Sequence, residues 1–167
     1  MKIFSPILIA AAFGASAGNL ENNRWEVSYG DNACYARSML PITQAIENTQ
    51  ISVVVALTRP ESNVSIRGEQ VRGRIIQIQI VEGDSAVKPQ ELFIGTGALR
   101  FQATSQTESK FGWLYFLLGE EADAVWAATL NNQDIVIDAG DLGRFSFSLT
   151  GTDIADAMVS ACSKVSR

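Results

Sequence analysis

The sequence predicts an α+β domain made mainly of β-strands, folded as an antiparallel β-sandwich or a strongly bent sheet, with two helices of which the second lies at the C-terminus. Three observations support this prediction. Apolar and polar residues alternate over several short segments. Two later segments have apolar residues at helical spacing instead. The composition, 47% hydrophobic and 19% charged, is ordinary for a folded chain and argues against disorder.

Four segments alternate and therefore predict strands that are buried on one face. In the clearest of them, Ile76, Ile78 and Ile80 share one face, whereas Gln77 and Gln79 share the other. The other three cover residues 24–29, 99–104 and 144–149.

Two further segments, residues 51–57 and 111–118, are apolar on both faces and predict strands that are covered on both sides. Residues 135–137 make another short apolar strand. The chain therefore contains about seven or eight strands, which is the number and spacing expected of a sandwich or a strongly bent sheet.

The first predicted helix follows the acidic residues Glu120, Glu121 and Asp123, which suit a helix N-terminus because they oppose the positive end of its dipole. Its apolar residues recur at helical spacing. They are Ala122, Val125, Trp126 and Leu130. The pair Asn131-Asn132 predicts the stop.

The second predicted helix follows residues 150–153, in which Thr150 or Thr152 can cap the first turn. Its larger apolar residues are expected to share one side that faces the core. They are Ile154, Met158, Ala161, Cys162 and Val165.

Residues 1–17 have the pattern of a secretory signal peptide: Lys2 supplies a positive charge, a short apolar run follows, and Ala-Ser-Ala ends it. The alternative is a retained membrane anchor, but this needs about 20 apolar residues. The run here is shorter and contains Pro6. We expect cleavage after Ala17, no membrane-spanning segment beyond it, and one β-rich domain over residues 18–167 that is periplasmic or secreted.

The two cysteines, Cys34 and Cys162, lie near the two ends of this predicted domain. They are too far apart in sequence for a C-x-x-C redox motif, and two cysteines alone supply no metal site. In an oxidising compartment we expect one disulfide that joins the first strands to the last helix. In the chain-entropy model a loop of this length is worth at most about 4–5 kcal/mol.

The chain has no histidine, which excludes Ser-His-Asp and Cys-His catalysis and nearly all imidazole-based metal sites. The net charge of −5 and the lack of a basic stripe argue against nucleic acid and anionic membranes as partners. Residues 95–97 lack the third glycine of a dinucleotide fingerprint, and residues 138–141 lack the spacing of a calcium loop. We expect both segments to be turns, and we expect no metal and no cofactor.

Residues 85–88 match the S-x-x-K motif of penicillin-recognising serine enzymes. Those enzymes place the serine at a helix start and need S-D-N and K-T-G motifs as well. Here Pro89 follows the motif, the segment predicts a turn, and neither companion motif occurs. We therefore assign no catalytic residue.

The only cluster of positive residues lies in and beside the predicted loop 60–73, and its members Arg67, Arg72 and Arg74 are the candidate contact surface. The alternative is an ordinary solvated loop. The hypothesis that the protein is an enzyme would require a cleft that brings together polar residues distant in sequence. Candidates for that cleft are Glu120, Asp138 and Arg144.

Several short motifs, taken in order, resemble the invasion-associated locus B family of small exported bacterial proteins. The N-terminal motifs are Trp25-x-Val27, Cys34-Tyr35-Ala36-Arg37-Ser38 with Pro41, Thr58-Arg59-Pro60 and Asn63-Val64-Ser65. The later ones are Phe101 before Trp113, the helix-forming segment 123–130, and Phe145-Ser146-Phe147-Ser148-Leu149-x-Gly151 followed by Ala155, Ala157 and Cys162. Family members often have an Arg-Gly-Thr run before the last strand, where this chain has Asp141-Leu142-Gly143-Arg144.

The resemblance implies export to the periplasm or cell surface and an association with host-cell invasion, and it supplies no catalytic residue or cofactor. The leading hypothesis is therefore a non-catalytic envelope or surface protein that acts by binding an unknown protein partner. The alternative is an envelope enzyme or enzyme inhibitor with an unrecognised polar cleft.

Overall fold

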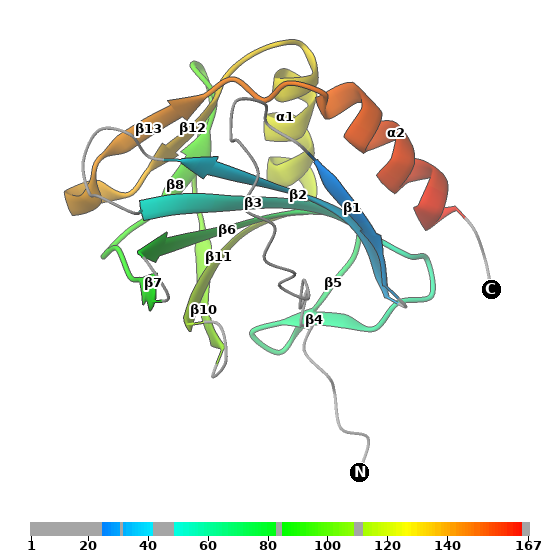
Figure 1. Ribbon diagram of the computed structural model, residues 1–167. Coiled ribbons are helices and arrows are strands. Elements are labelled where there is room, and N and C mark those ends of the chain that lie inside the picture. Colours follow the sequence, from blue (N-terminus) through cyan, green and yellow to red (C-terminus); the bar gives the residue numbers. More distant parts are fainter. Residues whose placement is uncertain (1–24, 31, 42–48, 83–84, 109–111, 165–167) are drawn as a thin grey trace.

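The computed structural model describes residues 25–30, 32–41, 49–82, 85–108 and 112–164. The predicted signal peptide, Phe111 and Val165 lie outside these ranges. The structure confirms an α+β fold that is mainly β, with open antiparallel sheets and a second helix near the C-terminus (Figure 1).

The larger sheet has seven strands, and every neighbouring pair is antiparallel. Six of them follow one another in the spatial order β1 (Glu26–Tyr29), β2 (Ala33–Pro41), β3 (Thr49–Thr58), β6 (Arg74–Glu82), β11 (Gly112–Leu118) and β10 (Thr104–Glu108). The seventh, β7 (Ser85–Val87), pairs with β6. The turn predicted for residues 85–88 is therefore wrong, because Ser85 begins a short strand.

A four-stranded antiparallel sheet has the order β13 (Arg144–Phe147), β12 (Ile135–Asp138), β8 (Phe93–Gly95) and β9 (Arg100–Gln102). The two predicted turns lie here. Residues 95–97 lead into the β8–β9 connection, and the β12–β13 connection contains a 3₁₀ turn, η1 (Gly140–Leu142).

The main core lies between the larger sheet, the four-stranded sheet and α1 (Gly119–Leu130). Alternate positions of β3 and β6 face it because the pleat brings every second side chain to the same side. These residues are Ile51, Val53, Val55, Ile76, Ile78 and Ile80. Ile94, Ile135 and Ile137 reach the core from the four-stranded sheet, and Val125 and Trp126 reach it from α1.

A two-stranded hairpin, β4 (Val64–Ile66) with β5 (Glu69–Val71), forms most of residues 60–73, where we expected a loop with at most one short strand. It packs on one end of the larger sheet against Ala56, Ile75 and Phe116. Because these residues point away from the main core, the packing explains why residues 51–57 and 111–118 are apolar on both faces.

The two helices cover the same face of the larger sheet, since the paired positions Ala36, Val55 and Ile76 share a face. α1 lies against β6 and β11, and α2 (Thr152–Ser163) lies against β1, β2 and β3 on the outside of the molecule (Figure 1). The predicted stop of the first helix is confirmed: Asn131 is its C-cap residue.

Two predictions about the second helix are wrong. Neither Thr150 nor Thr152 caps it; Gly151 is the N-cap residue with a left-handed φ of 73°, and the Thr152 hydroxyl donates to the carbonyl oxygen of Leu149 instead. Ile154 and Met158 do not face the core, because they are 64% and 41% exposed, and Ala161 is exposed as well.

The disulfide explains the face that α2 buries. Cys162 must point at β2, and the residues that share its face at helical spacing are Ala155 and Val159. Both are buried against Cys34 and Ala36. The helix is thereby rotated so that its largest apolar side chains point to solvent.

Candidate functional site

The Cys34–Cys162 disulfide is confirmed and joins β2 to α2 across 128 residues, with the two Cα atoms 6.0 Å apart. Arg59 lies beside it. Its Nη2 donates to the Sγ of Cys162 over 3.6 Å, and its Nε donates to the carbonyl oxygen of Gly30 over 3.2 Å. The sequence singled out this pairing, but not the arginine that flanks it.

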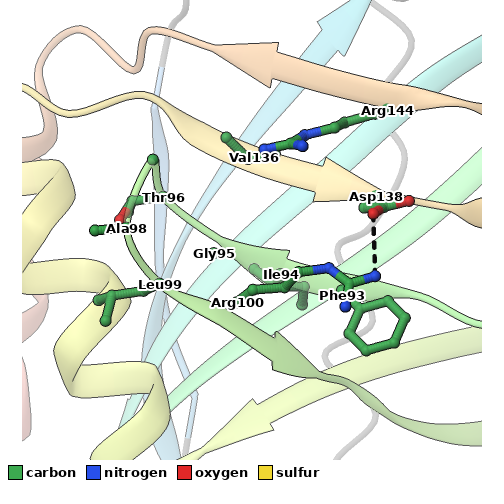
Figure 2. A pocket seen from close by; sticks show the side chains of 11 residues that line it. Phe93, Ile94, Gly95, Thr96, Ala98, Leu99, Arg100, Val136, Asp138 and Arg144 are labelled. Carbon is green, nitrogen blue, oxygen red and sulfur yellow. Dashed lines mark hydrogen bonds and ion pairs between the residues drawn. The ribbon is translucent and has the colours of Figure 1, made fainter.

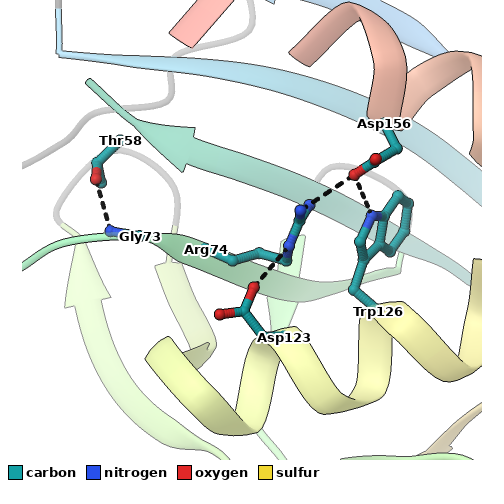
Figure 3. Close-up of polar contacts among 6 residues, drawn as sticks. All are labelled: Thr58, Gly73, Arg74, Asp123, Trp126 and Asp156. Carbon is teal, nitrogen blue, oxygen red and sulfur yellow. Dashed lines mark hydrogen bonds and ion pairs between the residues drawn. The ribbon is translucent and has the colours of Figure 1, made fainter. Parts of the chain in front are cut away.

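A second connection between the sheet and the helices is made by Arg74, Asp123, Trp126 and Asp156, which we call the helix clasp (Figure 3). Arg74 Nε contacts Asp123 Oδ1 of α1 over 3.0 Å, and its Nη2 contacts Asp156 Oδ1 of α2 over 3.1 Å. The same Asp156 oxygen accepts a 2.7 Å hydrogen bond from Trp126 Nε1. One guanidinium from β6 therefore holds both helices.

The clasp is supported on each side. The Arg74 guanidinium lies 5.6 Å from the centre of the Trp126 ring, close enough for a cation–π contact. Immediately before Arg74, the Gly73 N–H donates to the Thr58 hydroxyl over 2.7 Å, which directs the chain into β6 (Figure 3). Trp25 packs edge-on against Trp126 with ring centres 5.7 Å apart.

The structure does not bring the three predicted contact arginines together. Arg67 and Arg72 are exposed on or beside the β4–β5 hairpin, and Arg72 Nη1 donates to the carbonyl oxygen of Pro60 over 3.1 Å. Arg74 turns inward, with a side chain only 12% exposed, and its charge is matched by two carboxylates. Only Arg67 and Arg72 are therefore placed to meet a partner.

A hollow of about 100 Å³ lies on the four-stranded sheet, and its lining includes two of the three residues expected in a cleft, Asp138 and Arg144 (Figure 2). Asp138 Oδ2 forms an ion pair with Arg100 Nη2 at 3.2 Å, and the Arg100 guanidinium lies 3.4 Å from the centre of the Phe93 ring. Glu120 does not line this hollow and begins α1 instead.

Gly95 determines the shape of the hollow, because a Cβ there would overlap the carbonyl oxygen of Leu99. The tight approach of β8 and β9 therefore requires glycine, and it leaves a gap in the row of side chains between Val136 and Arg100. The volume is well below the roughly 300–1,000 Å³ typical of small-molecule sites. It suits a few waters or one small polar group.

The outward side of α2 is the most unusual surface of the described residues. We call it the α2 outer face, and its exposed members are Asp153, Ile154, Ala157, Met158, Ala161 and Lys164. Large apolar side chains on a surface helix normally face the core. The sequence of α2 places apolar residues on two sides of the helix, Ala155 and Val159 on one and Ile154 and Met158 on the other. The disulfide determines that the first side is buried.

Two described ionisable groups have shifted pKa values because of burial. Burial lowers the pKa of Arg37, opposed by the nearby Glu26 and Tyr35, and Arg37 Nε donates to the Ser52 hydroxyl over 3.1 Å. Burial raises the pKa of Tyr115, whose hydroxyl donates to the carbonyl oxygen of Pro89 over 3.0 Å. Both groups belong to the sheet rather than to the hollow or the α2 outer face.

Within the described ranges, no group of three or more acidic or cysteine side chains is arranged to hold a metal ion. Neither described helix is long and apolar enough to cross a membrane. Comparison with protein-family models, with characterised proteins and with solved structures finds no match to this chain.

Proposed function

We propose that the chain is an exported envelope or surface protein that acts by binding another protein, without catalysing a reaction. The observation that carries this proposal is the α2 outer face: two large apolar side chains exposed on a helix that is held rigidly to the sheet. Exposed apolar patches rimmed by polar residues mark interaction sites more often than chance.

Export is supported by the disulfide together with the signal-like segment 1–17. Disulfides persist in oxidising compartments and are rare in the cytosol. The bond between Cys34 and Cys162 is buried at one of its ends, because Cys34 is fully shielded from solvent.

Kinship with the invasion-associated locus B family is part of the same proposal. Its support is the ordered set of short motifs, and in particular the two cysteines near the ends of that set, which are bonded to each other. The motif Trp25-x-Val27 also lies close to Cys162, since Trp25 and Val27 both pack on the α2 junction.

Rigidity is what makes α2 suited to binding. The disulfide holds its C-terminal end, and the helix clasp holds its middle through Asp156. A surface that is already ordered loses little conformational entropy when a partner binds, so more of the contact energy appears as affinity.

Fractionation of cells that express the full chain tests the export half of the proposal. We expect a shortened protein outside the inner membrane whose mass matches cleavage after Ala17 and, without reductant, contains no free thiol. An uncleaved, reduced protein in the cytosol would overturn it.

Cross-linking on intact cells tests the binding half. The wild-type protein is compared with Met158→Asp, which places a charge in the middle of the α2 outer face, and with Ala127→Asp, which makes a similar change on the exposed side of α1. Loss of the cross-linked species in Met158→Asp alone is the expected result. Equal cross-linking in all three proteins would remove the α2 outer face from consideration.

The hollow on the four-stranded sheet favours the alternative of an envelope enzyme or enzyme inhibitor. It brings Asp138, Arg100 and Arg144 onto one surface from three strands. A change in hydrolase activity in envelope extracts on adding the wild-type protein, lost in Arg144→Ala and Asp138→Ala, would favour this alternative.

A further inference from the structure

We infer that the partner bound by the α2 outer face is a second copy of this chain, so that two molecules associate with their α2 helices side by side and antiparallel. This inference rests on the proposed binding function and names its partner. It is argued from the pattern of apolar, small and charged residues on one exposed helix.

The exposed arc of α2 has three parallel zones. With 3.6 residues per turn, Ala157 and Ala161 lie along the middle of the arc. Asp153 and Lys164 lie on one side of that line, and Ile154 and Met158 lie on the other. All six positions are exposed. The helix therefore offers a flat central line of small residues, a charged border and an apolar border.

This arrangement is complementary to itself under a two-fold axis. When two antiparallel copies of α2 pack along the alanine line, the axis falls near the level of Val159, and Ala157 of one copy lies opposite Ala161 of the other. Small residues at these positions let the two helix backbones approach closely. A two-fold axis also places like borders together, as an isologous interface requires.

The apolar border gains burial from this pairing. Met158 of one copy then lies beside Met158 of the second copy, and Ile154 lies near Ala161 of the second copy. Both large side chains are exposed in the single chain. Burying such side chains is the main favourable term in association. A parallel pair, with its two-fold axis along the helices, would place the apolar border of each copy against the charged border of the other, so the antiparallel pair is favoured.

The charged border also favours antiparallel packing. Asp153 lies at the N-terminal end of α2 and Lys164 lies just after its C-terminal end, so antiparallel packing brings each aspartate near the lysine of the other copy. Neither residue forms an ion pair with another described residue. The opposed helix dipoles add to the same preference.

The contact is small, and the association is therefore weak. Stable dimers bury about 1,600 Å² in total, whereas one pair of three-turn helices covers a fraction of that area. We expect a dissociation constant in the range of tens to hundreds of micromolar, which membrane-proximal crowding or high local concentration would overcome.

Sedimentation equilibrium of the disulfide-bonded exported protein tests this inference with two charge variants, Asp153→Lys and Lys164→Asp. Each variant by itself places like charges opposite each other in the dimer and is expected to weaken self-association about tenfold. Mixed together, the two variants complement each other at both pairs, so a heterodimer forms with about wild-type affinity.

A matched pair of steric variants supplies the second measurement. Ala161→Glu introduces a long charged side chain on the alanine line and abolishes dimerisation, whereas Ala127→Glu on the exposed side of α1 leaves it unchanged. Circular dichroism checks that all variants keep the fold. The Asp153→Lys/Lys164→Asp double variant shows whether any loss comes from the helix ends themselves, because it restores the pair while keeping both changes.

The outcomes separate this inference from the proposed function. A protein that stays monomeric at millimolar concentration overturns the self-association, and so does a mixture of the two charge variants that fails to associate. If such a monomer still loses its cellular cross-link in Met158→Asp, the binding function stands with a different partner. If neither measurement responds to the α2 variants, both proposals fall.

Discussion

α1 and α2 are both 12 residues long, yet they are attached to the same sheet by different means. The helix clasp reaches both of them, but α1 also buries Val125 and Trp126 in the main core, so hydrophobic packing is its main attachment. α2 buries only Ala155 and Val159 among its apolar side chains and is held by a disulfide and the helix clasp.

This difference explains how a helix can leave its largest apolar residues in solvent. Attachment by packing uses up the apolar face of a helix, because the same residues provide the binding energy to the core. Attachment by a covalent bond and an ion pair does not require an apolar face, so the large apolar side chains of α2 can stay exposed.

The replacement Trp126→Ala is expected to destabilise the protein by about 4 kcal/mol, since truncating a buried tryptophan leaves a large cavity. Trp126 is 2% exposed and also donates its Nε1 hydrogen bond to Asp156. Urea unfolding followed by circular dichroism measures the change. Ala127→Ser, on the exposed side of α1, is the control and stays within about 0.5 kcal/mol.

Replacing Cys34 and Cys162 together by serine is expected to cost about 3 kcal/mol, within the range seen on removing native disulfides. The effect is concentrated on α2, because the packing beneath it is limited to small side chains. Hydrogen exchange should show loss of protection in α2 and retained protection in α1. Equal loss in both helices would contradict the contrast drawn here.

The Asp156→Asn replacement is expected to cost about 1–2 kcal/mol, because it removes a partly buried charge that faces Arg74 while keeping an acceptor for Trp126. Asp123→Asn makes the same change at a carboxylate that is 60% exposed, and we expect less than about 0.5 kcal/mol there. Thermal unfolding of both variants measures and compares the two losses of stability. A larger effect at Asp123 would show that the clasp serves α1 more than α2.

The variant Tyr115→Phe tests the core beneath α1 through its pH dependence. Burial raises the pKa of Tyr115 above the value of about 10 that it has when unfolded. Its contribution to stability is therefore complete below pH 10 and is lost as the pH rises through the folded-state pKa. At pH 7 we expect the variant to be about 1 kcal/mol less stable than wild type, because the hydrogen bond to Pro89 is lost.

Unfolding titrations between pH 8 and pH 12 provide the measurement. The stability gap between wild type and Tyr115→Phe is expected to narrow above about pH 10. A gap that stays constant over this range would mean that the tyrosine does not titrate differently in the folded and unfolded states.

The smallest effect is expected for Met158→Ser. It should change the stability of the protein by less than about 0.5 kcal/mol, because the exposed Met158 side chain contributes little to the packing of the single chain. Val125→Ala on α1 removes a similar amount of apolar surface from a fully buried position and should cost about 2 kcal/mol. Chemical unfolding at a low protein concentration compares the two. A costly Met158→Ser would mean that this residue supports the fold of the single chain.

Much of the fold could be predicted because alternation and helical spacing are local properties. The spacing of Ile76, Ile78 and Ile80 predicts a strand with one buried face, and this face points into the main core. The acidic start and the double-asparagine stop predict α1 almost to the residue. The cysteine count and a signal-like start were enough to expect the disulfide.

The surfaces were harder to predict, since they depend on which side of an element meets the rest of the molecule. Arg74 is adjacent in sequence to exposed arginines, but its position at the start of β6 turns it between the two helices. Asp138 and Arg144 were expected in one cleft and do lie together, because an antiparallel hairpin pairs them. Glu120 does not join them, since no local pattern relates α1 to that hairpin.

Local patterns along the chain were enough to predict a mainly β fold, the position of both helices and the pairing of the two cysteines. Each of these follows from the periodicity of side chains along the chain or from a count of reactive groups. The buried side of α2 could not be predicted in this way, because it depends on Cys34, which lies 128 residues from Cys162 in the sequence. The bond rotates the helix onto Ala155 and Val159 and leaves Ile154 and Met158 in solvent.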